Sequence, residues 1–340
     1  MEKLLVKKNE LAGIAEKIAG ETNLYAPVKD EDNVLFTLLK GTKCELEGYK
    51  NTKNAPKGFF FPRSETLMRY KRTDKGMELA DVVNESGPAV LFGVRPCDAR
   101  SFALLDMLFD QESYRDPYYI DKRNNTTVVA LACVHPPYST CFCTSVGGSP
   151  ASTDGVDVML TDLGDAYLAE FLTDKGAKLA KYFGSVKADA ASDTKKSELA
   201  ASAAKEIKSA VPAKEIKKFL DENFEHPFWE TLHKKCLACG TCTFLCPTCH
   251  CFDIQDEVKD ADGKRLRNWD SCMFPLFTKE TSGHNPRPSQ KERWRQRVMH
   301  KFRYYVDNFN AIACVGCGRC VMYCPVNMDI RKIVEDISKL

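Results

Sequence analysis

The sequence predicts an α/β domain followed by a smaller, cysteine-rich α+β domain that carries a long helical insertion. Three observations lead to this fold class. Apolar runs alternate with helical patterns over residues 1–165, which is typical of α/β structure. Residues 166–223 are rich in Ala, Lys and Glu, as expected of surface helices that connect two domains. Residues 224–340 contain a repeated cysteine motif, with an insertion over 252–313 between its two copies.

The first domain shows the pattern of a parallel sheet. Residues 88–94 (PAVLFGV), 127–133 (TVVALAC) and 156–163 are short apolar runs that predict buried strands. Between the first two runs, apolar residues recur at helical spacing over 98–109, so we expect a strand-helix-strand unit there. Residues 1–20 scatter charges among apolar side chains, which indicates an amphipathic helix rather than a signal peptide.

Composition and charge exclude several classes of function. The chain has 49 basic and 47 acidic residues, a net charge of +2. This balance argues against a protein that coats nucleic acid or a membrane surface, and we expect no nucleic-acid partner. No apolar stretch approaches the length that spans a bilayer. The expected location is therefore the cytoplasm.

Sixteen cysteines are many for a chain of 340 residues. Disulfides are rare in a reducing cytosol, so metal ligation is the better explanation. Most of these cysteines fall into local clusters. The clusters are Cys133, Cys141 and Cys143; six cysteines from Cys236 through Cys251; and four from Cys314 through Cys324. The remaining cysteines are Cys44, Cys97 and Cys272.

The repeated motif predicts two 4Fe-4S clusters. CLACGTCTFLCP begins at Cys236 and CVGCGRCVMYCP begins at Cys314, and the two align without a gap. This is the spacing of bacterial two-cluster ferredoxins, in which the fourth cysteine of each run ligates the other cluster. Cluster I is assigned to Cys236, Cys239, Cys242 and Cys324. Cluster II is assigned to Cys246, Cys314, Cys317 and Cys320.

Other residues of the repeat suit this purpose. Gly240 and Gly318 follow the second cysteine of each run, where the missing side chain permits unusual backbone dihedrals. Arg319 would place a positive charge near cluster II, where it would raise the potential or mark a docking edge. The alternative is a zinc module, but zinc usually takes two separated pairs of ligands. The doubled run of four cysteines therefore favours iron-sulfur clusters.

Four further cysteines predict a third 4Fe-4S cluster. Cys97 follows the strand at 88–94 and Cys133 ends the strand at 127–133, so both thiols should lie at the carboxyl edge of one parallel sheet. Cys141 and Cys143 follow in a loop. Buried structural cysteines and a zinc site are the alternatives. The residues expected around this site are Arg95, Asp98 and Arg100.

The remaining cysteines have no clear pattern. Cys249, Cys251 and Cys272, with His250, could hold a further cluster or metal or line a relay, but packing around the insertion is the favoured interpretation. Cys44 is expected to be a buried structural thiol. The insertion ends in a basic helical pattern, whose cations we expect on a solvated face. These cations are Arg293, Arg295, Arg297 and Lys301, and the apolar stripe beside them is Trp294, Val298 and Phe302.

No motif indicates catalysis or nucleotide binding. The chain has no G-x-G-x-x-G after a strand and no phosphate-binding lysine loop, so neither a flavin nor a nucleotide is expected on it. It has no nucleophile elbow and no HExxH motif. His284 and His300 are expected to be structural. The chain thus has no evident catalytic centre of its own.

Several segments resemble one family of iron-sulfur subunits. They include GVRPCDARSFALLD, DPYY, CPTCHCFD, WDSC and HKF. These segments are similar to the iron-sulfur beta subunit of cytosolic sulfhydrogenases and to the corresponding iron-sulfur subunit of anaerobic sulfite reductase. The resemblance implies a protein that relays electrons between a flavoprotein handling NAD(P)H and a catalytic subunit. The alternative is a reductase whose own catalytic cluster is held by Cys249, Cys251 and Cys272.

Overall fold

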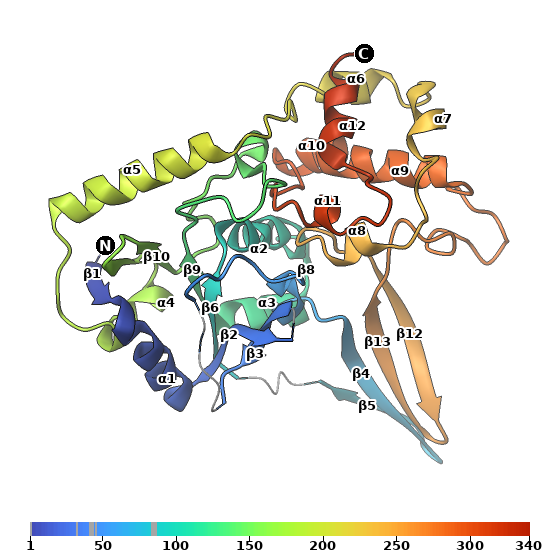
Figure 1. The fold of residues 1–340 in the computed structure, drawn as a ribbon. Coiled ribbons are helices and arrows are strands. Elements are labelled where there is room, and N and C mark those ends of the chain that lie inside the picture. Colours follow the sequence, from blue (N-terminus) through green and yellow to red (C-terminus); the bar gives the residue numbers. More distant parts are fainter. Residues whose placement is uncertain (1, 32, 41–43, 45, 83–86) are drawn as a thin grey trace.

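The computed structural model describes residues 2–31, 33–40, 44, 46–82 and 87–340. Figure 1 shows three parts: a large sheet with helices around it near the N-terminus, a group of helices and loops near the C-terminus, and a smaller sheet that projects from the body. Within the described residues, no helix is both long and apolar enough to cross a membrane.

The large sheet has the strand order β1-β11-β10-β9-β6-β2-β3. Its inner neighbours β2–β6, β6–β9 and β9–β10 are parallel, which confirms the parallel arrangement of the three predicted strands. Its outer strands pair antiparallel. The strands are β1 (Glu2–Lys7), β2 (Asn23–Asp30), β3 (Asn33–Leu38), β6 (Ala89–Val94), β9 (Thr126–Leu131), β10 (Val158–Asp162) and β11 (Ala166–Phe171).

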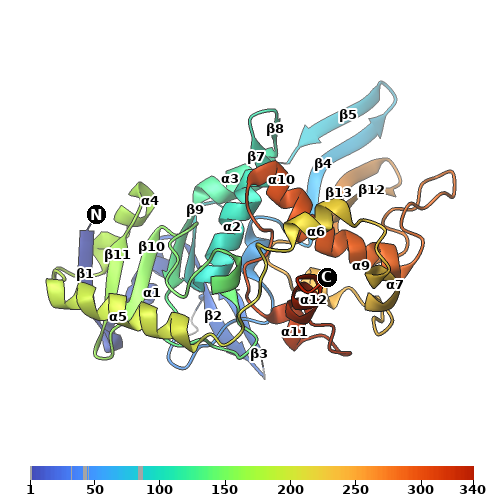
Figure 2. The same ribbon diagram turned by 90° about the horizontal axis from the view of Figure 1, so that it is seen from above.

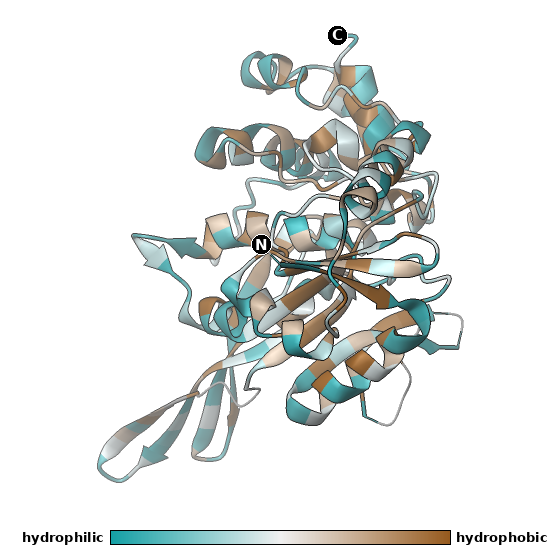
Figure 3. Cartoon of the chain, turned by 90° about the vertical axis from the view of Figure 1, so that its left-hand side faces the viewer, coloured by the Kyte–Doolittle hydropathy of each residue, from teal (hydrophilic) through white to brown (hydrophobic). Residues whose placement is uncertain are grey.

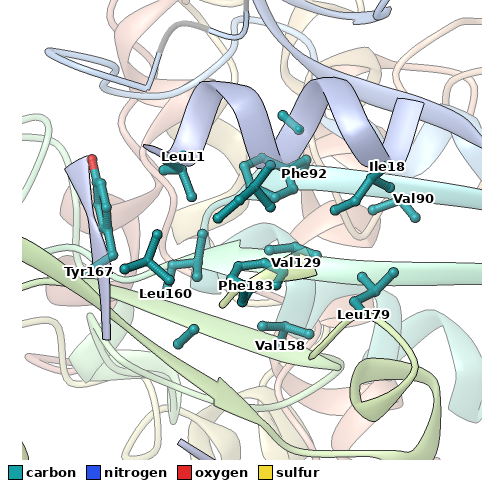
Figure 4. Close-up of a cluster of buried hydrophobic side chains, with 14 of the residues drawn as sticks. Leu11, Ile18, Val90, Phe92, Val129, Val158, Leu160, Tyr167, Leu179 and Phe183 are labelled. Atoms are coloured by element: carbon teal, nitrogen blue, oxygen red, sulfur yellow. The ribbon is translucent and has the colours of Figure 1, made fainter. Parts of the chain in front are cut away.

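Helices cover both faces of this sheet. On one face, Leu11 and Ile18 of α1 (Leu11–Glu21) pack onto Val90, Phe92 and Val129, as Figure 4 shows. The other face packs against α2 (Pro96–Phe109) and α3 (Pro117–Asn125). Because both faces are covered, the central strands are continuous apolar runs, which Figure 3 shows as the most hydrophobic part of the chain.

The smaller sheet joins two distant parts of the sequence. Its order is β12-β13-β4-β5, and all of its pairs are antiparallel. The strands are β4 (Ser64–Thr73), β5 (Gly76–Asp81), β12 (Phe252–Lys259) and β13 (Asp262–Trp269). Figures 1 and 2 show this sheet projecting beyond the helices. The expected helical insertion thus begins with a β-hairpin, residues 252–269, that pairs with the N-terminal part of the chain.

The C-terminal part is built from short helices around a core of Trp229, Trp294, Val298 and Phe302. The expected apolar stripe of the insertion lies in this core, which confirms it. The helices are α6 (Lys217–Glu222), α7 (Phe228–Leu232), α8 (Thr241–Phe244), α9 (Gln290–Met299), a π-helical turn (His300–Tyr304), α10 (Tyr305–Phe309), α11 (Arg319–Met322) and α12 (Ile330–Ile337).

Two sequence-based expectations differ from the structure. Residues 2–7 form the edge strand β1 instead of the start of a helix, and burial alternates along it: Leu4 and Val6 are buried, while Leu5 between them is more exposed. The segment 166–223 begins with β11, so the large sheet extends beyond residue 165. Its helices are α4 (Asp174–Ala177), α5 (Ala190–Glu206) and α6; the other short elements are β7 (Asp110–Gln111) and β8 (Tyr114–Arg115).

Candidate iron-sulfur sites

The four cysteines assigned to cluster I line one cavity. Cys236, Cys239 and Cys242 come from the loop before and within α8, and Cys324 arrives from the second run. Trp294, Met273 and Met328 supply apolar walls. Two backbone amides already donate to these sulfurs, from Ala238 to Cys236 Sγ at 3.3 Å and from Met328 to Cys324 Sγ at 3.2 Å. Such donors are suited to a cluster that carries negative charge.

The four cysteines assigned to cluster II line a second cavity. Cys246 enters from the first run, and the other three belong to the second run: Cys314, Cys317 and Cys320. Lys301 reaches this cavity and donates from Nζ to Cys246 Sγ at 3.4 Å. Burial raises the pKa of the Cys317 thiol to about 12, so iron would have to displace its proton on binding.

The two glycines of the repeat have the backbone that the sequence analysis expects. Gly240 and Gly318 have φ of +72° and +76° and lie immediately before α8 and α11. A side chain would be strained in this left-handed conformation. A Cβ at Gly240 would also lie 2.7 Å from the Phe274 ring. Both runs therefore turn sharply after their second cysteine.

The four cysteines proposed for a third site line a third cavity. They are Cys97, Cys133, Cys141 and Cys143. Cys97 lies in the first turn of α2 rather than in a loop, so the positive end of that helix faces the site. Cys133 lies just beyond β9, and its amide donates to Pro150 O at 2.8 Å. Burial raises the pKa of the Cys143 thiol to about 12.

The second and third cavities are neighbours. Cys317 lines both of them. The amide of Phe142 donates to Gly316 O at 2.9 Å, which joins the loop of the third site to the second cysteine run. A Cβ at Gly316 would lie 2.4 Å from the backbone nitrogen of Cys143, so only glycine permits this approach. Phe142 therefore lies between two groups of thiols.

Arg319 does not lie at a docking edge. It is buried, and its guanidinium donates to both carboxylate oxygens of Asp98, at 2.5 and 2.8 Å. It also donates to Thr52 O and Asn51 Oδ1. The reason is that the second run packs against α2, so its arginine is paired across that contact. Asn51 in turn lies 4.0 Å from Cys97 Sγ.

The other residues expected around the third site occupy different places. Arg95 lines the cavity and donates to Lys50 O at 2.7 Å and to Ala132 O at 3.2 Å. Arg100 donates to Cys314 O at 3.4 Å, so it lies between the third site and the second run. Each arginine therefore helps to fix the backbone near the cysteines.

The remaining thiols also come together. Cys249, Cys251 and Cys272 line a fourth cavity with His250 and His300. Cys272 and Cys251 also pack in the apolar core around Trp294, as the favoured interpretation expects. The basic helix differs from expectation. All four of its cations are buried: Arg293, Arg295, Arg297 and Lys301. They are buried because α9 and the π-helical turn after it run through the core, where the four cations bond to backbone, sulfur and carboxylate atoms.

Three side chains near the sites give no signal in the sequence. Lys57 donates from Nζ to the carbonyl oxygen of Cys249, 192 residues away. Gln290 donates to Cys236 Sγ at 3.2 Å, and Asn51 is near Cys97. No local spacing links these residues to the cysteines that they contact. Of the other single residues, Cys44 is half-buried and packs against the core of the large sheet, and His284 is exposed.

The donor sets suit clusters better than single ions. In tetrahedral zinc sites the thiolate sulfurs lie about 3.7 Å apart, as Zn–S bonds of about 2.3 Å require. Among the described residues, no group of three or more Cys, His, Asp or Glu side chains is close enough to hold one metal ion. The first three cavities instead have four thiols around a shared space. The residues present therefore fit 4Fe-4S clusters.

Each of the two cysteine runs contributes its fourth cysteine to the cavity of the other run. This arrangement defines the class of two-cluster iron-sulfur proteins. The family model for the 4Fe-4S dicluster domain matches residues 235–328. Over 319 residues the chain is 30% identical to "Sulfhydrogenase 2 subunit beta" of Pyrococcus furiosus, which covers 93% of this chain and 92% of that relative. The chain therefore belongs to the family of sulfhydrogenase beta subunits. No solved structure matches the chain.

Proposed function

We propose that this chain is an electron relay with three 4Fe-4S clusters, held by the ligands that the cysteine spacing assigns. The observation that carries the proposal is that neighbouring cavities are linked by residues that line or contact both. Cys317 lines both the third and the second cavity, and Arg297 lines the second while donating to Cys242 O of the first cysteine run at 2.8 Å. Each bound cluster would supply a one-electron carrier. The expected order is third site, cluster II, cluster I.

The protein around these sites has two tasks in the proposal. Apolar residues such as Phe142 and Trp294 keep water from the cavities. Amides and cations beside the sulfurs stabilise negative charge there. Arg319 does not add to this charge, because Asp98 balances it. Cluster II is therefore tuned by Lys301 and Arg297 rather than by the arginine within its own motif.

The relay would connect two partner proteins. Cys239 is exposed, and Leu237 beside it is 64% exposed, so the edge of cluster I faces the surface. An exposed apolar side chain next to a cluster ligand suits a docking contact. As the two partners we propose a flavoprotein that handles NAD(P)H and a catalytic redox subunit. The name of the relative, subunit beta of a sulfhydrogenase, supports further subunits, and the types of partner follow from the sequence resemblance alone.

The experiment is iron, acid-labile sulfide and zinc analysis of anaerobically purified full-length variants. Cys133→Ala should lower the iron content by about four atoms per chain, and so should Cys320→Ala, because each cubane holds four irons. Cys44→Ala is the matched control, since half-buried Cys44 packs against the core of the large sheet, and it should keep the full iron content. Unchanged iron in Cys133→Ala would exclude the third cluster, and zinc in place of iron would exclude the relay.

A further inference from the structure

The fourth cavity is lined mainly by residues that carry thiols, imidazoles and cations. Its walls are Thr248, Cys249, His250, Cys251, Cys272, Arg297, His300, Lys301 and Ala313. Structural cysteines usually pack as small apolar side chains among other apolar groups. Here Ala313 is the one aliphatic residue among the wall residues. Cys272 and Cys251 also pack in the apolar core around Trp294, so the cavity joins that core to a group of potential ligands and cations.

Three buried cations surround these thiols. Lys57, Arg297 and Lys301 are 2%, 2% and 6% exposed. Their hydrogen-bond partners are backbone carbonyls, the Thr248 hydroxyl and two cysteine sulfurs, and none of these partners is a carboxylate. Burying a charge is costly unless an opposite charge lies beside it. The cations therefore require negative charge within this part of the molecule.

Arg297 points to the place where that charge should lie. Its Nη1 donates to Cys249 Sγ at 3.6 Å. Its Nε is buried and has no hydrogen-bond partner. Arg297 also lines the cavity of cluster II, as Lys301 does. Cluster II can balance part of this charge. Lys57 lines neither cavity, but it donates to the carbonyl oxygen of Cys249 and so lies behind one of the thiols of the fourth cavity.

His250 is prepared to act as a ligand. Its Nδ1 lies 3.1 Å from Thr248 O. Because a carbonyl oxygen only accepts hydrogen bonds, the proton must be on Nδ1, which leaves the Nε2 lone pair available. A backbone carbonyl on one ring nitrogen is the usual arrangement when the other nitrogen binds a metal. Within the part of the chain that the structure describes, no backbone carbonyl fixes the tautomer of His300 in this way.

We propose that Cys249, Cys251 and Cys272 bind a fourth iron-sulfur cluster, with His250 as its fourth ligand. Three thiolates and a neutral imidazole around a 4Fe-4S core give a net charge of about −1 when oxidised and about −2 when reduced, which offsets part of the charge of the three cations. The shared walls formed by Arg297 and Lys301 place this cluster beside cluster II, so it forms a branch of the proposed relay. It would accept one electron from cluster II or donate one electron to it.

The first test is the iron content of the anaerobically purified full-length chain and of Cys272→Ala. The proposal predicts about sixteen irons in the unaltered chain and about twelve in the variant. Cys44→Ala is the matched control and should retain all of its iron. Equal iron in Cys272→Ala and the unaltered chain would overturn the fourth cluster, whether those thiols are then free or joined in a disulfide.

This result is separable from a failure of the proposed third cluster. If the unaltered chain contains about twelve irons, the two variants decide which site is empty. Loss of iron in Cys272→Ala with no loss in Cys133→Ala would support the fourth cluster and exclude the third. The opposite pattern would overturn the fourth cluster and leave the three-cluster relay intact.

The imidazole ligand is tested by pulsed EPR on the dithionite-reduced chain labelled with 15N-histidine. The proposal predicts a directly coordinated nitrogen that disappears in His250→Cys, while the iron content stays the same because cysteine can replace the imidazole. His300→Gln is the matched variant and should keep the coupling. The absence of the coupling in the unaltered chain, or its loss only in His300→Gln, would overturn the role of His250. These readouts do not require loss of iron, so they remain decisive if Cys272→Ala fails to fold.

Discussion

At the scale of single residues, the packing of the two domains depends on a buried ion pair. Asp98 of α2 and Arg319 of α11 are 221 residues apart in sequence, and their side chains are 0% and 3% exposed. Removing water from two charges is costly, and the pair is tolerated because every oxygen of the carboxylate is bonded to the guanidinium. Removing one partner should therefore lower the free energy of unfolding by more than the intact pair contributes to it.

Asp98→Asn should destabilise the chain strongly, because it leaves the Arg319 charge buried and uncompensated. Breaking such a pair typically costs about 3–5 kcal/mol. The measurement is anaerobic guanidinium denaturation followed by circular dichroism. The double variant Asp98→Asn with Arg319→Gln should recover much of the loss. If the two single losses simply add in the double variant, the two side chains are not coupled and the assignment is wrong.

Gly316→Ala should be more damaging than the same change at another glycine with positive φ. Gly316 has φ +65°, and its Cβ would lie 2.4 Å from the nitrogen of Cys143; Gly283 has φ +86° with open space around it. A left-handed alanine alone costs about 1 kcal/mol, which is the loss expected for Gly283→Ala. Gly316→Ala should lose clearly more in the same denaturation experiment. Equal losses would contradict the close approach of the two loops.

At the scale of elements, an ionic network fixes the projecting sheet to the body. Glu65 of β4 accepts hydrogen bonds from Arg267 of β13 and from Lys122 of α3. Arg267 also donates to Asp116, which caps the start of α3. The side chains of Glu65 and Arg267 are almost fully buried. The network thus connects the hairpin of the insertion to the first domain.

Glu65→Gln should loosen this connection, because it removes the carboxylate that buried Arg267 and half-buried Lys122 share. Arg267 keeps Asp116 as a partner, so a loss of about 2 kcal/mol is expected from the weakened hydrogen bonds between charged groups. Hydrogen exchange should accelerate in β4 and β13 relative to β6 and β9. Glu257→Gln is the control, since its ion pair with Lys264 is exposed, and it should leave exchange unchanged. Uniform acceleration across all four strands would contradict a local role.

The sequence predicts some elements of this fold and not others, for physical reasons. The strands at 88–94 and 127–133 are continuous apolar runs because helices cover both of their faces, so their pattern is strong. The strand β1 is short, and its alternation rests on Leu4 and Val6 alone. The pairing of β4 with β13 has no local signal, because the two strands are far apart in the sequence. Buried cations such as Lys57 were missed for the same reason.

At the scale of the whole molecule, the candidate sites are more predictable than the fold. Cysteine spacing within each run is local information, so the grouping of eight side chains around two cavities follows directly from the motif. The third group depends on the sheet edge, and the structure brings its four thiols to one cavity as expected. The fourth group, Cys249, Cys251 and Cys272 with His250, depends on tertiary contacts of α9. The sequence pattern predicted the cations of that helix on a solvated face, so these contacts could not be expected. Ligation of iron by these groups remains our proposal.

The measurement that tests the relay most directly is an anaerobic reductive titration of the full-length chain, counted as electrons per chain and followed by EPR. Three clusters should accept about three electrons, and the fourth cluster should raise this to about four, because each 4Fe-4S cluster is a one-electron carrier. The signals should show spin coupling, since the cavities share walls. Uptake of two electrons or fewer would contradict a relay that extends into the first domain.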